Sequence, residues 1–144
     1  MFDLRKILSI GQNSMIRKVV QKSDTAADYS KDLNELLATP PCVDMAIKAS
    51  MQTVDQYLPD GYISIGCSTE FTHTATTSLG MTITIKASII ALEDHEVIFG
   101  IEAWDEQGEV GHGLHKRFIV NREALLKKAK QRTRFLANRQ LYNV

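Results

Sequence analysis

The sequence predicts an α+β fold in which one antiparallel sheet packs against one buried helix. Three observations lead to this prediction. Residues 39–58 carry apolar side chains at helical spacing, residues 62–74 and 81–90 alternate as strands do, and only short turn-like segments separate the strand candidates after residue 62. The length of 144 residues suits one domain.

The first expected element is a strand within residues 9–22, SIGQNSMIRKVVQK, because this segment is rich in β-branched residues. A polar connector at residues 23–32 follows it. We expect this connector to lead into the helix.

The helix is expected to begin at Thr39 and to end before Pro59-Asp60-Gly61. Thr39 can cap its N-terminus, and Pro40 and Pro41 suit the first turn, where no backbone donor is required. The expected buried face contains Val43, Ile47, Met51 or Ser50, Val54 and Leu58, widened by Met45, Ala46 and Ala49.

Four more strands are expected, which gives a sheet of about five. Residues 62–74 should place Ile63, Ile65, Cys67, Thr69, Phe71 and His73 on one face. Residues 81–90 should bury Met81, Ile83, Ile85, Ala87 and Ile89. Residues 97–104 and 109–120 follow after turns near 91–94 and 105–108, and a helix is expected from Arg122 onward.

The zero net charge is a cancellation between two parts of the chain. Residues 122–144 contain seven basic side chains and one acidic one, which leaves 10 basic and 16 acidic residues before them. We therefore divide the chain into a domain at 1–121 and a basic helical extension at 122–144. The neutral total argues against a protein that binds nucleic acid over its whole surface.

Other classes of protein are excluded by what the sequence lacks. Cys42 and Cys67 are too few for a disulfide scaffold, and neither stands at a metal-ligand spacing, so no metal site is expected. No stretch has the roughly 20 apolar residues of a membrane span, and no signal peptide is evident at the N-terminus. The default expectation is a cytoplasmic protein without a membrane partner.

Four features are candidates for chemistry, and each has a simpler alternative. Thr39 can be a plain helix cap, and His73 can be a general base or a structural histidine bonded to a carbonyl. Gly66 interrupts a strand, where a ligand, the packed helix or a bulge can require a glycine. Arg117, in the segment GHGLHKR, can hold an anionic group or pair with the acidic body of the protein.

Taken in order, three segments resemble one family. These segments are ATPP at the helix start, GCSTEFTHTATTSLG on the next strand and DEQGEVGHGLHKRFIV at the end. They resemble the fluoroacetyl-CoA-specific thioesterase branch of the hotdog-fold thioesterases. The shared spacing includes the seven positions from Gly66 to His73 and the Gly-x-Gly-x-His-x-Arg pattern ending at Arg117.

The resemblance implies a hotdog fold, with the sheet wrapped around the helix that begins at Thr39. It also implies a homodimer or a dimer of dimers, with active sites between subunits. The substrate would be an acyl-CoA thioester, and no resident cofactor is implied. Thr39 and His73 take the catalytic positions, whereas Gly66 and Arg117 take positions near the substrate.

One departure from the family concerns Ile47, which stands where the family has a catalytic glutamate and which we place among the substrate-binding residues. An isoleucine can neither orient nor charge-stabilise the histidine, and Asp44, one turn earlier, is only a partial substitute. Two hypotheses therefore stay open. The chain is an acyl-CoA thioesterase, or it is a non-catalytic dimer that binds or senses acyl-CoA.

Overall fold

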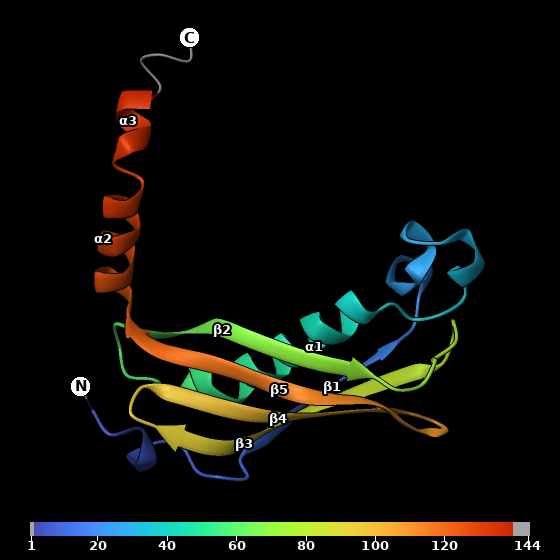
Figure 1. Ribbon diagram of the computed structural model, residues 1–144. Coiled ribbons are helices and arrows are strands. Elements are labelled where there is room, and N and C mark those ends of the chain that lie inside the picture. Colours follow the sequence, from blue (N-terminus) through green and yellow to red (C-terminus); the bar gives the residue numbers. More distant parts are fainter. Residues whose placement is uncertain (1, 140–144) are drawn as a thin grey trace.

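Five antiparallel strands and one long helix make up the body of the protein (Figure 1). The computed structural model describes residues 2–139, and the side chains of residues 2–137. The strands, in the order in which they lie in the sheet, are β1 (Asn13–Val19), β3 (Thr82–Glu93), β4 (Glu96–Asp105), β5 (Gly108–Asn121) and β2 (Tyr62–His73). The expected α+β class and five-stranded sheet are confirmed.

Two-residue turns connect β3 to β4 and β4 to β5, close to the places expected from the sequence. Asp94 adopts a positive φ of 47° at the first turn, a conformation that aspartate tolerates better than most residues. Along β3, Ile83, Ile85 and Ile89 alternate into the core as expected. Such short turns give the antiparallel pairing of neighbouring strands.

Helix α1 (Thr39–Val54) packs across β3, β1 and β2. Its fully buried face is made of small or flexible side chains: Cys42, Met45, Ala46, Ala49, Ser50, Thr53 and Val54. Val54 and the widening residues Met45, Ala46 and Ala49 are buried as expected, and Ser50 is buried in place of Met51. Val43 and Ile47, in contrast, are only half-buried. Small residues suit this face because the curled sheet approaches the helix closely.

The predicted N-cap is wrong. The helix begins at Thr39 itself, Ala38 occupies the cap position, and no side chain caps the helix. This change frees the Thr39 hydroxyl for a contact outside the helix.

A bulge in β2 corrects the predicted strand faces. The pairing with β5 shifts between Gly66 and Ser68, so that Cys67 has no opposite residue. Before the bulge Ser64 and Gly66 face the helix, and after it Thr69, Phe71 and His73 do, whereas Ile63, Ile65 and Cys67 do not belong to this face. One extra residue shifts the two-residue side-chain period, which explains how Gly66 and His73 share a face at an odd spacing.

Two parts of the chain extend beyond the helix and sheet (Figure 1). The segment between β1 and α1, residues 20–38, forms three short 3-10 turns, and we call it the β1–α1 segment. At the other end, α2 (Arg122–Arg132) follows β5 directly, and α3 (Phe135–Arg139) follows α2. Residues 140–144 of the predicted extension lie outside the described part. No described helix is long and apolar enough to span a bilayer.

Candidate active site

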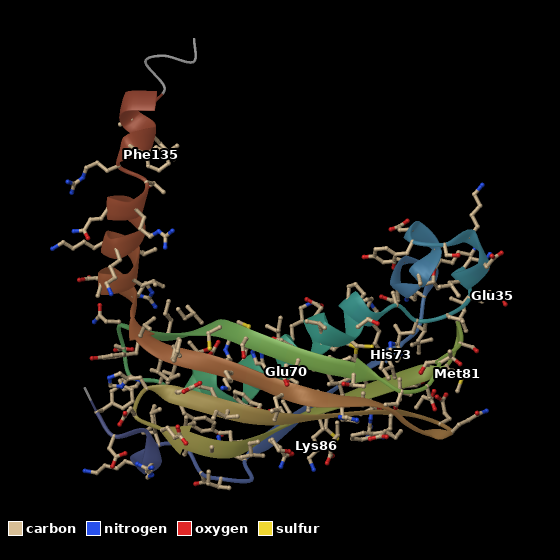
Figure 2. All side chains as sticks on the ribbon, in the orientation of Figure 1. Glu35, Glu70, His73, Met81, Lys86 and Phe135 are labelled. Carbon is tan, nitrogen blue, oxygen red and sulfur yellow. The ribbon has the colours of Figure 1, made fainter. Side chains whose placement is uncertain are left out.

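A cleft of about 560 Å³ opens where the N-terminal end of α1 meets the last residues of β2. Thr39 and Pro40 come from the helix, His73 and Thr74 come from the strand, and the β1–α1 segment supplies the remaining wall with apolar side chains such as Leu33 and Leu36. Figure 2 shows His73 at the end of β2, near the start of α1. Two residues that lie 34 positions apart in the sequence therefore share one cavity.

The Thr39 hydroxyl lies 3.1 Å from Nδ1 of His73. The other ring nitrogen, Nε2, is buried and has no hydrogen-bond partner in the described part of the protein. Burial lowers the pKa of His73 below its usual value of 6.5, and the backbone of Ala75 opposes this only in part. A neutral imidazole whose Nδ1 lies within hydrogen-bond distance of a hydroxyl can act as a general base.

The described residues that line this cleft include no carboxylate. Ile47 is half-buried on α1 and does not line the cleft. Asp44, the partial substitute considered from the sequence, is exposed and pairs with Lys48 at 2.8 Å. Within one chain, neither Ile47 nor Asp44 forms a hydrogen bond with His73. Neither therefore acts as a third catalytic group there.

A second polar cluster lies further along β2 and β5. Nε of Arg117 donates to Oγ of Ser64 at 2.9 Å, and Nη2 donates to the Ser64 carbonyl at 3.0 Å. The Ser64 hydroxyl donates to Asp55 Oδ1 at 2.5 Å. Arg117 is only 4% exposed, and burial lowers its pKa while the nearby Asp55 carboxylate opposes the shift.

His115 completes this cluster on the other side of the guanidinium. Its Nε2 lies 3.2 Å from Arg117 Nη1, and its Nδ1 lies 2.7 Å from the Thr69 hydroxyl. Arginine can only donate, so Nε2 accepts and Nδ1 carries the proton. Burial, and then the charge of Arg117, lower the pKa of His115 to about 4.

Gly66 lies directly over these two side chains. A Cβ at this position would approach Arg117 Nη1 to 3.3 Å and His115 Cε1 to 3.4 Å. The glycine therefore leaves a small space that is lined by the Arg117 guanidinium and by the edge of the His115 imidazole. Two glycines of β5, Gly111 and Gly113, serve packing instead, because a Cβ there would collide with Phe71 and with the Glu70 carbonyl respectively.

The sequence singled out Gly66 and Arg117 but missed Asp55, Ser64 and Thr69 as partners. A usable signal existed for His115, because the spacing of two residues from His115 to Arg117 places both on one strand face. The described residues contain no group of three or more His, Cys, Asp or Glu side chains arranged to hold a metal ion.

Comparison with known proteins decides the family. The model of the family described as fluoroacetyl-CoA-specific thioesterase matches residues 20–123. The chain belongs to this family. The fluoroacetyl-CoA thioesterase of Streptantibioticus cattleyicolor is 31% identical over 118 residues, which cover 82% of each chain. The family match and this relative confirm the resemblance noted in the sequence, and they support the assignment of the protein as a thioesterase, which is a hydrolase.

Solved structures show the same architecture. A hot-dog-like protein from Thermanaerovibrio acidaminovorans superposes with a TM-score of 0.87 at 27% identity, covering 91% of this chain and 97% of that one. A fluoroacetyl-CoA thioesterase variant in complex with acetyl-CoA superposes with a TM-score of 0.77 at 26% identity, covering 88% and 99%. The fold is therefore the hotdog fold.

Proposed function

We propose that this protein hydrolyses small acyl-CoA thioesters, with His73 as the base and Thr39 as its hydroxyl partner. The observation that carries the proposal is the 3.1 Å contact between Thr39 Oγ1 and His73 Nδ1 inside a cleft. Membership of a thioesterase family supports the same chemistry. CoA enters as part of the substrate, and no resident cofactor takes part in the proposed reaction.

In the first half of the proposed reaction, His73 removes a proton from Thr39 and then gives a proton to the leaving group. Nδ1 of neutral His73 takes the proton of the Thr39 hydroxyl as its oxygen attacks the thioester carbonyl, and the imidazolium returns a proton to the departing CoA thiolate. Water then hydrolyses the acyl-threonine ester with the same histidine as base. If Thr39 only positions the water, His73 deprotonates that water directly, and the overall products, a carboxylic acid and free CoA, are unchanged.

The two polar clusters require a second chain to act on one substrate. Gly66 and His73 lie seven residues apart on β2, a separation of roughly 20 Å in an extended strand. That distance is too long for one small acyl group to touch both. Because β2 is an edge strand with one free side, antiparallel pairing of β2 with β2 of a second copy can set Gly66 opposite the partner's His73. We therefore propose a homodimer with two shared sites.

A small acyl group fits this shared site. The space over Gly66 would be filled by a single methyl group, and its floor offers the remaining N–H groups of Arg117. A short acyl chain with an electronegative atom suits such a floor better than a long apolar one. The relative bound to acetyl-CoA, itself a short acyl thioester, supports this choice.

The test is release of free thiol from a panel of short-chain, halogenated and aromatic acyl-CoAs. We expect turnover of the short esters and a loss of at least about a hundredfold in kcat for His73→Ala. Thr39→Ser should retain more activity than Thr39→Val, because only serine keeps the hydroxyl. His112→Ala, at an exposed histidine, is the matched control. Equal turnover by His73→Ala and the wild type would exclude the role of His73.

The second candidate function is binding of acyl-CoA without turnover, and it is favoured by the apolar residue at Ile47 and the lack of a carboxylate among the described lining residues of the cleft. Calorimetry separates the two functions. Saturable binding of an acyl-CoA with no thiol release would favour the sensor, and Ile47→Glu would then be expected to introduce some hydrolysis. Absence of any CoA-ester binding would reject both functions.

A cytoplasmic location is also part of the proposal. Its support is the pair of free thiols, Cys42 and Cys67, because reducing compartments keep such thiols unpaired. Fractionation of cells that express the tagged protein would test it.

A further inference from the structure

Two segments of the chain line the cleft beside the Thr39–His73 pair. Residues 74–76 follow His73 directly, and residues 36–38 lead into Thr39. The first segment belongs to the connection between β2 and β3, residues 74–81, which we call the β2–β3 loop. The second is the end of the β1–α1 segment. The 3.1 Å contact between Thr39 and His73 therefore depends on how these two segments are held relative to each other.

The backbone of Thr77 joins the two segments. Its carbonyl accepts a hydrogen bond from the Leu37 amide at 2.8 Å, and the Leu79 amide donates to the Glu35 carbonyl at 2.7 Å. These bonds pair the β2–β3 loop with the β1–α1 segment as a short antiparallel ladder that lies outside the five-stranded sheet. Figure 2 shows Glu35 and Met81 at the same end of the molecule. A displacement of one segment is therefore passed to the other.

The side chain of Thr77 attaches this ladder to the sheet. Its hydroxyl donates to Asp105 Oδ2 at 2.8 Å, and the amide of Gln107 donates to Asp105 Oδ1, also at 2.8 Å. Asp105 is the last residue of β4, so its carboxylate belongs to the turn between β4 and β5. Figure 1 shows this turn at the end of the sheet where the β1–α1 segment rises. The hydrogen bond therefore fixes the β2–β3 loop relative to the sheet.

Both side chains of this hydrogen bond are buried. Thr77 is 0% exposed and Asp105 is 8% exposed. A buried carboxylate is costly unless its oxygens have hydrogen-bond donors, and here one donor serves each oxygen. Such a bond depends on distance and direction, and the loss of one partner leaves the other buried and unpaired. These properties suit a contact that determines local geometry rather than one that adds apolar packing.

We infer that Thr77 and Asp105 are positioning residues that hold the Thr39 hydroxyl within reach of Nδ1 of His73. This inference rests on the proposed roles of Thr39 and His73. Neither Thr77 nor Asp105 is among the described lining residues of the cleft, so both act through the segments that they hold. Without their hydrogen bond the ladder can shift, and a misplacement of about 1 Å is enough to slow a reaction that depends on positioned groups.

Thiol release from a short acyl-CoA by the full chain tests this role. Thr77→Val replaces the hydroxyl with a methyl group and should lower kcat at least about tenfold, while KM changes less than about threefold. Thr77→Ser keeps the hydroxyl and should stay within about threefold of the wild type in kcat. Thr53→Val is the matched control, because Thr53 is 2% exposed and its hydroxyl also donates a buried hydrogen bond, to the Ala49 carbonyl at 2.8 Å. Its kcat should stay within about twofold of the wild type.

Variants at the acceptor provide an independent measurement. Asp105→Ala should reproduce the loss seen with Thr77→Val, and the double variant should lose no more than the weaker of the two, because all three lack the same hydrogen bond. Asp105→Asn, whose amide can still bond the Thr77 hydroxyl, should retain more activity than Asp105→Ala. Glu106→Ala is the control from the same turn. Glu106 accepts from the Thr82 amide at 2.9 and 3.1 Å on the exposed surface, and its loss should leave kcat within about twofold.

A loss of activity that acts through the Thr39–His73 pair should vanish when the pair is absent. In the His73→Ala background, adding Thr77→Val should change the residual kcat by less than about twofold. A further tenfold loss in that background, or an equal loss in Thr53→Val and Thr77→Val, would overturn the positioning role.

The nitrogen NMR signals of the His73 ring test the positioning without any turnover. Thr39→Val removes the hydroxyl that lies 3.1 Å from Nδ1, so it gives the shift of the Nδ1 signal when this contact is lost. Thr77→Val should move the signal in the same direction, whereas Thr77→Ser and Thr53→Val should not. These shifts without thiol release by the wild type would uphold the positioning and reject the proposed hydrolysis. Wild-type turnover, with an unmoved signal and unchanged kcat in Thr77→Val and Asp105→Ala, would reject the positioning alone.

Discussion

At the scale of single residues, His115 is held neutral by its surroundings. It is 1% exposed, accepts from the buried Arg117 and donates to Thr69. A proton on Nε2 would meet the guanidinium and break this contact. The imidazole therefore acts as a fixed acceptor that orients Arg117, and its protonation must cost stability.

This arrangement predicts a pH dependence of stability. The folded protein binds a proton at His115 with a pKa of about 4, whereas the unfolded chain does so near 6.5. The unfolded state therefore binds more protons between these values, and the free energy of unfolding should fall by up to about 3 kcal/mol as the pH drops from 6.5 to 4. Urea unfolding at pH 7 and pH 4.5 measures this fall. His115→Gln should show a smaller fall, and His112→Gln should behave as the wild type does.

The lowered pKa of His73 predicts that activity, like stability, rises with pH. Its pKa lies below 6.5 because burial disfavours the charged ring, and only the neutral ring can act as a base. The rate kcat/KM should rise with pH through an apparent pKa below 6.5 and be level by about pH 7. A pH–rate profile measures this, and an inflection above pH 7 in the acid limb would contradict the assignment.

Gly66 predicts a change in activity without a large change in stability. In Gly66→Ala the new methyl group would approach Arg117 and His115 to 3.3 and 3.4 Å, occupying the space that we assign to the acyl group. We expect kcat/KM for a short acyl-CoA to fall at least about tenfold, with a shift in the unfolding free energy below about 1 kcal/mol. Gly100→Ala, where a Cβ meets Ile90 at 3.3 Å, is the matched control and should keep its activity.

At the scale of elements, the packing of α1 against the sheet relies mainly on small side chains. Two of the larger apolar residues that the sequence pattern predicted to be buried, Val43 and Ile47, are only half-buried. Ala46, Ala49 and Ser50 are all 0% exposed, so the curled sheet lies against the helix backbone. The two prolines of the first turn start the helix at Thr39 and leave its hydroxyl free for His73.

Enlarging this face should destabilise the fold. Ala49→Leu adds three carbon atoms to a closed interface, and we expect a loss of about 1–3 kcal/mol in the free energy of unfolding from overpacking. Met51→Leu, on the exposed side of the same helix, should change it by less than about 0.5 kcal/mol. Urea denaturation of both variants measures the difference, and equal effects would show that the helix face is not closely packed.

At the scale of the whole molecule, the distance between the two polar clusters determines how many chains form one site. If His73 of one subunit works with Gly66 of the other, inactive variants can complement each other. His73→Ala and Gly66→Val homodimers should each be inactive, whereas a statistically mixed population should regain about a quarter of wild-type activity. Mixing under dissociating conditions and assaying thiol release measures this, and no recovery would place each site within one chain.

Much of this architecture could be predicted from local patterns. The alternation in 81–90 indicates the buried face of β3, and the Pro-Pro pair locates the start of α1. The spacings of the glycines and histidines along β2 and β5 are typical of the family. These features are local, because side-chain periodicity and turn chemistry act over a few residues.

What the sequence by itself determined was the class of fold, the family and the identities of Thr39, Gly66, His73 and Arg117 as candidates. The tertiary structure decided that Thr39 contacts His73 instead of capping its helix, and that a bulge at Cys67 brings Gly66 and His73 to one face. It also decided that Ser64, Asp55 and His115 hold Arg117. These contacts join residues from separate elements, and their geometry depends on the register and curl of the whole sheet, which no local pattern specifies.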